Sequence, residues 1–279
     1  MSRPRILTFD SGLGGLTVFR EIAKLIPEAD HVYAADDAGF PYGDWAADDL
    51  VWRVVAVMRR LIADFEPQAV CIACNTASTL VLPHLRAAFP DLPFVGTVPA
   101  VKPAAGRSRS QMISVLATPG TVARDYTREL VHSFAAHCRV ELVGSKTLAR
   151  IAEDFMHGRP VSDTAIASEI AACFVQDGAR RTDEIVLACT HYPLLTAHFE
   201  RLAPWPVEWI DPAPAIARRV EFVLREKALE HTDERARDPQ WRAVFTSGAA
   251  PDAELARALD RFGLRATAFA AMPATRVRA

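Results

Sequence analysis

Two cysteines occupy matching positions in this chain. Ala73-Cys74-Asn75-Thr76 and Ala188-Cys189-Thr190-His191 each follow an apolar run of strand length and precede a helical pattern. A thiol at a helix N-terminus lies at the positive end of the helix dipole, which favours the thiolate and lowers the thiol pKa. If Cys74 and Cys189 face one cleft from opposite sides, one thiolate can remove a proton from carbon while the other thiol returns a proton to the opposite face. The pair therefore predicts stereoinversion at carbon by two bases.

Two further predicted strands end in polar segments, Asp10-Ser11 and Thr118-Pro119-Gly120-Thr121. In parallel sheets, ligands bind beyond the carboxyl ends of the strands, where helix N-termini point inward. The hydroxyl, amide and imidazole groups beside the two cysteines could there hold the carboxylate and ammonium groups of a small substrate.

The elements that must position these groups alternate between strand and helix. Four buried strands are each followed by a helical pattern: Ile6–Phe9, Ala69–Ala73, Met112–Ala117 and Glu184–Ala188. Such alternation is typical of βαβ units and of mostly parallel sheets covered on both faces. Because the two halves of the chain line up, the sequence predicts two pseudo-symmetric α/β domains with the active site in the cleft between them.

The domain boundaries follow from the last βα units, which are too few to form a domain of their own. We expect residues 1–98 and 207–279 to form the first domain and residues 99–206 to form the second. Within the second domain, Val161–Asp177 is predicted to be a helix. The charged stretch Glu226–Trp241 is predicted to be an exposed loop.

The composition of the 279 residues is that of a folded globular protein, with 50% hydrophobic and 24% charged residues. A net charge of −2 gives no general electrostatic reason to expect a nucleic-acid or membrane partner. The chain has no apolar stretch long enough for a signal peptide or a membrane span, so a cytoplasmic location is expected. Five cysteines, an odd number, indicate free thiols in a reducing compartment.

The other three cysteines, Cys71, Cys138 and Cys173, are predicted to be core residues. Cys71-Ile72-Ala73-Cys74 has the C-x-x-C spacing of redox and zinc sites, but the sequence has no second such pair. Cys71 is in mid-strand and is predicted to face away from the Cys74 site. We therefore expect neither a metal nor a redox dithiol here.

Three glycines, Gly12, Gly14 and Gly15, follow the first predicted strand. They suggest a phosphate-binding loop, but neither nucleotide fingerprint is complete. The glycines are better explained by a tight turn that lets the backbone approach a small carboxylate.

Four segments, in this order along the chain, resemble the signature segments of the glutamate racemases. They are Phe9-Asp10-Ser11-Gly12-Leu13-Gly14-Gly15-Leu16, Phe40-Pro41-Tyr42-Gly43, Cys74-Asn75-Thr76-Ala77-Ser78 and Ala188-Cys189-Thr190-His191-Tyr192-Pro193-Leu194-Leu195. Weaker matches are Gly120-Thr121-Val122 and Asp211 followed by Ala215-Ile216-Ala217. The glutamate racemases are cofactor-independent enzymes that supply D-glutamate for bacterial peptidoglycan synthesis.

This resemblance implies an isomerase that interconverts L- and D-glutamate without cofactor or metal. It implies that Cys74 and Cys189 are catalytic, assisted by acidic or imidazole side chains at Asp10, Glu153 and His191. The positions implied to bind glutamate are Asp10, Ser11, Tyr42, Gly43, Asn75, Thr76, Thr121, Thr190 and His191. A homodimer is left open.

The chain departs from the family pattern at three places. Asp36-Asp37 and Asp44 add acids to the loop before and after Pro41-Tyr42-Gly43, and Val98–Pro103 replaces a common Glu-Pro-Gly segment. Asp211-Pro212-Ala213-Pro214 replaces Asp-Ser-Gly. Two alternatives stay open: an aspartate racemase of the same fold, although Thr190-His191 favours glutamate, and a thiol-based redox or binding protein.

Overall fold

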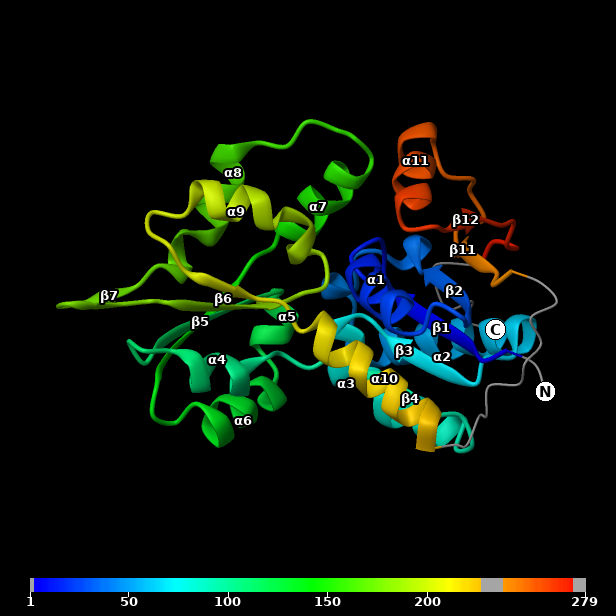
Figure 1. Ribbon diagram of the computed structural model, residues 1–279, viewed down its shortest axis with the longest axis horizontal. Coiled ribbons are helices and arrows are strands. Elements are labelled where there is room, and N and C mark those ends of the chain that lie inside the picture. The colour runs from blue at the N-terminus through cyan, green and yellow to red at the C-terminus, as the bar shows by residue number, and fades with distance from the viewer. Residues whose placement is uncertain (1–2, 227–237, 273–279) are drawn as a thin grey trace.

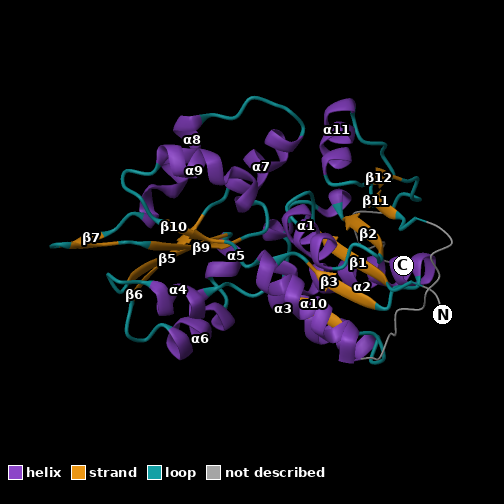
Figure 2. Ribbon diagram, in the orientation of Figure 1, coloured by secondary structure: helices purple, strands orange, loops and turns teal. Residues whose placement is uncertain are grey.

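The computed structural model describes residues 3–226 and 238–272. Within these ranges the chain forms one parallel sheet of six strands and one of four, each lying between helices (Figure 1). Figure 2 shows the two groups of strands next to one another, with connecting loops between them. The predicted α/β class with mostly parallel sheets is confirmed.

The six-stranded sheet contains the N-terminal strands and the last two strands of the chain. Its order is β12-β11-β2-β1-β3-β4, and all its pairings are parallel. The strands are β1 (Arg5–Asp10), β2 (Asp30–Ala35), β3 (Ala69–Ile72), β4 (Phe94–Gly96), β11 (Trp241–Phe245) and β12 (Arg265–Ala266). Its helices are α1 (Leu16–Leu25), α2 (Ala47–Phe65), α3 (Asn75–Ala88), α10 (Ala213–Glu226) and α11 (Ala253–Arg261).

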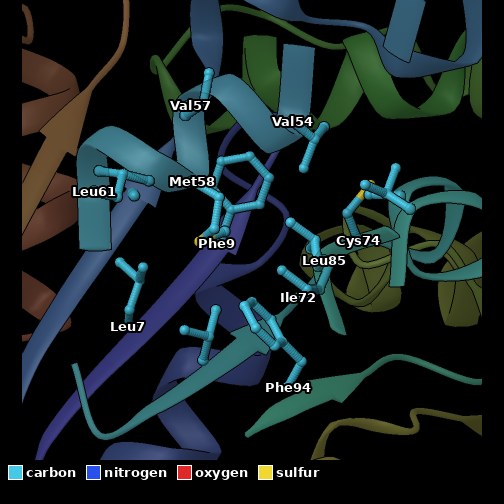
Figure 3. Close-up of a cluster of buried hydrophobic side chains, with 14 of the residues drawn as sticks. Leu7, Phe9, Val54, Val57, Met58, Leu61, Ile72, Cys74, Leu85 and Phe94 are labelled. Carbon is cyan, nitrogen blue, oxygen red and sulfur yellow. The ribbon is translucent and has the colours of Figure 1, made fainter. Parts of the chain in front are cut away.

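Alternation along β1 and β3 divides the core of this sheet between its two faces. Leu7, Phe9 and Ile72 pack against α2 and α3, as the close-up shows (Figure 3). Ile6 and Cys71 point the other way, towards α1 and α10. Helix α2 presents Val54, Val57, Met58 and Leu61, at helical spacing, to the first face. Cys74 lies at the edge of this cluster, where β3 has ended.

The four-stranded sheet has the order β10-β9-β5-β6 and is also parallel. Its strands are β5 (Met112–Ala117), β6 (Arg139–Gly144), β9 (Glu184–Ala188) and β10 (Glu208–Ile210). Its helices are α4 (Val101–Arg107), α5 (Pro119–Val122), α6 (Asp125–Phe134), α7 (Leu148–Met156), α8 (Asp163–Ile170) and α9 (Thr196–Leu202). Val115 and Ala117 of β5 face the α4 side, whereas Leu116 faces α7, α8 and α9.

Two details differ from the sequence-based expectation. The helix predicted over Val161–Asp177 is wrong at its C-terminal end, since α8 stops at Ile170 and a two-stranded antiparallel hairpin follows. This hairpin joins β7 (Gln176–Asp177) to β8 (Arg180–Arg181). Gly178 has a φ of +58°, a left-handed conformation that turns the chain where a helix cannot continue.

The second difference concerns where the chain returns to the six-stranded sheet. Strand β10 extends the four-stranded sheet by pairing with β9, and Trp209 of β10 packs on Phe199 with ring centroids 5.1 Å apart. Helix α10 then packs on α1. We therefore propose that the first domain resumes after Ile210 and not at residue 207, with the division near residue 98 kept as predicted.

The remaining expectations concern the C-terminal region. Of the predicted loop Glu226–Trp241, residues 227–237 lie outside the described residues, and β11 begins at Trp241. No helix within residues 3–226 and 238–272 is both long enough and apolar enough to span a bilayer.

Candidate active site

A small cavity of about 30 Å³ lies where the carboxyl ends of strands from both sheets meet. It is lined by Ser11, Phe40, Pro41, Tyr42, Gly43, Cys74, Asn75, Thr76, Thr118, Ala149, Cys189, Thr190 and His191. Both cysteines of the matching motifs are therefore on its wall, Cys74 after β3 and Cys189 after β9. Each is only 6% exposed.

Cys74 takes the N-cap position of α3, in an extended conformation. Its Sγ lies 3.9 Å from the Ser11 Oγ. Burial raises the pKa of the Cys74 thiol well above its usual value and the Asp10 charge raises it further, against a smaller effect of the Ala77 N–H. The expected lowering of this pKa by the helix N-terminus is therefore wrong for Cys74, because desolvation outweighs the helix dipole.

Cys189 differs from Cys74 in the element that follows it. A short 3₁₀ helix, Tyr192–Leu195, follows it before α9 begins. Its Sγ is 3.8 Å from Nδ1 of His191, two residues further on. The imidazole is thus the polar side chain next to this thiol, while a hydroxyl has that place beside Cys74.

His191 forms a buried pair with Glu153, which comes from α7. His191 Nε2 is 2.7 Å from Glu153 Oε1, and the same oxygen accepts a hydrogen bond of 2.6 Å from the Leu13 N–H. Burial by itself would lower the pKa of His191, but the contacts with Cys189 and Glu153 and the Asp10 charge hold it well above its usual value. These contacts favour the protonated imidazole, which lies beside the Cys189 sulfur.

Asp10 is fully buried at the end of β1 and does not line the cavity. Its carboxylate accepts hydrogen bonds from the N–H groups of Gly12 and Gly15, both 3.1 Å, and from the Thr190 hydroxyl at 3.4 Å. Burial raises the pKa of Asp10 above its usual value, while His191 and these N–H groups lower it. Asp10 therefore connects the loop after β1 with the Cys189 motif.

The three glycines after β1 make room for the protein's own acid and imidazole groups. A Cβ on Gly12 would collide with Glu153 Oε1, and one on Gly14 would collide with the His191 ring and lie 2.6 Å from the His191 backbone N. A Cβ on Gly15 would lie 2.7 Å from the Asp10 Cβ. The tight turn predicted here is present, but it brings the loop against Asp10, Glu153 and His191 of the protein itself, and the approach to a substrate carboxylate stays a prediction.

Gly14→Ala is expected to destabilise the fold by about 1–3 kcal/mol and to reduce the activity of this site, because the new methyl group would push His191 away from Cys189. Gly106→Ala in α4 is the matched control, because nothing lies within 4 Å of a Cβ there. Its helix propensity predicts a gain of about 0.5–1 kcal/mol and unchanged activity. Urea unfolding and initial rates of both variants provide the check, and a stable, fully active Gly14→Ala protein would contradict this role of the glycine.

The predicted binding residues reach the cavity to different extents. The Asn75 carboxamide lines it, is 3% exposed, and has no hydrogen-bond partner for either polar atom. A buried amide of this kind is costly unless a ligand satisfies it. Thr76 Oγ1 is 3.3 Å from Thr118 Oγ1, which spans the two sheets across the cavity wall.

Thr121 and Tyr42 differ from their predicted placement. Thr121 is fully buried behind Thr118, with the two hydroxyl oxygens 3.1 Å apart, and does not line the cavity. Tyr42 lines the cavity, but its hydroxyl donates to Asp36 at 2.5 Å and so points away from it. Thr118 was not among the predicted binding residues, although it ends β5 as Asp10 ends β1, a signal that could have identified it.

Comparison with known proteins agrees with this geometry. Residues 14–220 match the family model for Asp/Glu/hydantoin racemases. The chain is 54% identical over 260 residues to a glutamate racemase of Agrobacterium fabrum (strain C58), which covers 93% of each protein. The chain belongs to the glutamate racemase family. It is therefore an amino-acid racemase by descent, as the sequence motifs indicated.

Solved structures show the same relationship. A crystal structure of Escherichia coli glutamate racemase in complex with L-glutamate and the activator UDP-MurNAc-Ala superposes with a TM-score of 0.85 at 37% identity, over 96% of this chain and 99% of that one. The glutamate racemase isoform RacE1 of Bacillus anthracis shares the fold, with a TM-score of 0.80 at 24% identity over 99% of this chain and all of that one.

The remaining cysteines lie away from the cavity. Cys71 and Cys173 are buried, and burial raises the pKa of each thiol to about 12. Cys138 is only half-buried, beside the cluster that β5 forms with α4. Core placement is thus confirmed for Cys71 and Cys173, whereas Cys138 is only partly buried beside its hydrophobic cluster. The described part of the chain contains no group of three or more His, Cys, Asp or Glu residues that could hold a metal ion.

Proposed function

We propose that this protein interconverts L- and D-glutamate, with Cys74 and Cys189 as its two acid/base groups and with no cofactor. The observation that carries the proposal is the presence of both thiols on one small cavity, each after a strand of a different sheet. A reacting carbon between them has one sulfur on each face. Family membership supports glutamate as the substrate.

In one direction the thiolate of one cysteine takes the α-proton, so that the Cα–H bond breaks, an S–H bond forms and the electron pair stays on the substrate. The thiol of the other cysteine then protonates the opposite face of Cα and becomes a thiolate. The reverse reaction exchanges these roles. Since an ordinary thiol has a pKa of about 8.5, each sulfur needs help to ionise at neutral pH.

The neighbouring groups differ between the two sulfurs. His191, held by Glu153, stabilises a thiolate at Cys189. Cys74 has the Ser11 hydroxyl and the first turn of α3, and its raised pKa makes it a thiol in the resting protein. The two thiols therefore differ in their nearest polar partner, an imidazole for Cys189 and a hydroxyl for Cys74.

The lining polar groups would hold the substrate. The unpartnered Asn75 amide, with Ser11, Thr76, Thr190 and the main chain at Gly43, supplies donors and acceptors for carboxylate and ammonium groups. A cavity of about 30 Å³ has room for about one water molecule, so glutamate enters only when the loops of the two sheets separate. We also propose that the protein supplies D-glutamate for peptidoglycan and is located in the cytoplasm. Light scattering would decide between a monomer and a homodimer.

The deciding experiment is solvent exchange at the α-carbon. Chelator-treated, cofactor-free protein is incubated with each glutamate enantiomer in D₂O, and α-proton loss is followed by NMR while chiral chromatography follows inversion. Deuterium should enter together with inversion, starting from either enantiomer. Faster exchange with aspartate would assign the protein to the aspartate alternative, and exchange with neither amino acid would refute the proposed function.

A further inference from the structure

The loop Asp36–Trp45 forms one wall of the cavity through Phe40, Pro41, Tyr42 and Gly43. The space around Gly43 is open, because nothing lies within 4 Å of the position of a Cβ there. The Phe40 ring lies 5.5 Å from the His191 ring. This wall therefore faces both the cavity that would hold the substrate and the His191–Glu153 pair.

A buried ion pair lies directly behind this wall. Arg53, on α2, is 1% exposed and Asp36 is fully buried. Arg53 Nη2 donates to Asp36 Oδ1 at 2.5 Å and Arg53 Nε donates to Asp36 Oδ2 at 2.7 Å, so the guanidinium grips the carboxylate with two bonds. A paired charge so deeply buried is costly to desolvate, and geometry and further hydrogen bonds must compensate that cost.

Two hydroxyls complete the hydrogen bonding of this carboxylate. Tyr42, on the cavity wall, donates to Asp36 Oδ2 at 2.5 Å. Thr246, directly after β11, donates to Asp36 Oδ1 at 2.5 Å. Since Thr246 does not line the cavity, the carboxylate connects the wall with a strand 210 residues away in the chain.

Neighbouring contacts fasten the same loop at other points. The Trp45 indole N–H donates to the Gly39 carbonyl at 2.8 Å, and its ring lies under the Arg53 guanidinium at 5.8 Å. A Cβ on Gly39 would come within 2.6 Å of Arg53 Nε. Asp37 is held by the Ser247 N–H at 2.8 Å. Asp36 and Asp37, two of the three acids in the loop that departs from the family pattern, are thus both hydrogen-bonded within the protein.

We propose that the network Arg53–Asp36–Tyr42–Thr246 is a positioning device that fixes the Phe40–Gly43 wall for glutamate binding. The Tyr42 hydroxyl acts on Asp36 and not on the substrate. Loosening the network from the Thr246 side, which never meets substrate, should therefore weaken substrate binding as much as loosening it from Tyr42. This inference rests on the proposed racemisation of glutamate.

The test compares Thr246→Val, Thr246→Ser and Tyr42→Phe with the wild-type protein. Loss of one hydrogen bond to a buried carboxylate should raise KM for both enantiomers about tenfold in Thr246→Val and Tyr42→Phe, with kcat changed much less. Thr246→Ser keeps the hydroxyl and should restore a wild-type KM. Thr8→Val is the matched control, since Thr8 is fully buried in β1 with an unpartnered hydroxyl and should leave KM unchanged.

Three results would contradict the proposed positioning role of this network. A raised KM in Tyr42→Phe alone would mean that the hydroxyl acts on substrate directly. A fall in kcat at constant KM in Thr246→Val would mean that the network only maintains the active fraction of protein. An unchanged KM in both variants would remove any positioning role. Calorimetry also measures the Kd of D-glutamate in each variant. A wild-type protein that binds glutamate without racemising it would refute the proposed function, and the comparison of variants would then rest on Kd in place of KM.

Discussion

Cys74→Ala and Cys189→Ala are each expected to lower glutamate racemisation by at least about 10⁴-fold, because each removes the only acid/base group at one face of the reacting carbon. Both sulfurs line the cavity, with the Ser11 hydroxyl 3.9 Å from Cys74 Sγ and His191 Nδ1 3.8 Å from Cys189 Sγ. Circular dichroism with L- and D-glutamate measures the loss. Cys138→Ala, a half-buried thiol outside the cavity, is the matched control and should keep wild-type activity.

A one-cysteine protein also separates the two-base mechanism from a mechanism in which a single base serves both faces of the carbon. The remaining thiolate can still remove the α-proton of one enantiomer, so a glutamate analogue with a leaving group at the β-carbon should lose that group. Cys74→Ala and Cys189→Ala should then act on opposite enantiomers of the analogue. Full racemisation by either variant would refute the two-thiol mechanism, as would elimination by both variants from the same enantiomer.

His191→Asn is expected to have the next largest effect, a fall of about 10²–10⁴-fold in kcat/KM, because it removes the cation that faces the Cys189 thiolate. L- and D-glutamate have equal free energies in solution, so kcat/KM must fall equally in both directions. Because His191 acts on Cys189 and not on Cys74, its role should instead appear in the primary isotope effect measured with α-deuterated substrate. That effect should rise for the enantiomer whose proton Cys189 takes.

The controls for His191 lie on α7 or directly after it. His157→Asn, on the segment following α7, breaks a contact with Asp252 but leaves the cavity wall intact, so activity should stay within about twofold of the wild type. The activity of Glu153→Gln should lie between those of His191→Asn and His157→Asn. The amide oxygen can still accept a hydrogen bond from the Leu13 N–H, but the negative charge that supports the imidazolium is lost. Equal isotope effects for both enantiomers of His191→Asn would contradict a role confined to Cys189.

Much of this site could be predicted because its signals are local. A strand that ends in Cys74-Asn75-Thr76, or in Cys189-Thr190-His191, places those side chains at the carboxyl edge of a parallel sheet, where ligands bind. The continuous apolar runs that make β3 and β9 buried strands are themselves in the sequence. The fold class, the two cysteines on one cavity and the tight glycine turn after β1 all follow from such short-range patterns.

Other features could not be predicted because they depend on residues distant in the chain. Strand β10 pairs with β9 while its Trp209 packs on Phe199 of α9, and the Tyr42 hydroxyl donates to Asp36 instead of to the cavity. The raised pKa of Cys74 reflects the balance between burial and a helix N-terminus, which only the packed surroundings fix. The sequence thus determined which groups could do the chemistry and at which strand ends they stand. Tertiary packing decided which of them are desolvated, paired or turned away, because desolvation and hydrogen bonding depend on every neighbour in space.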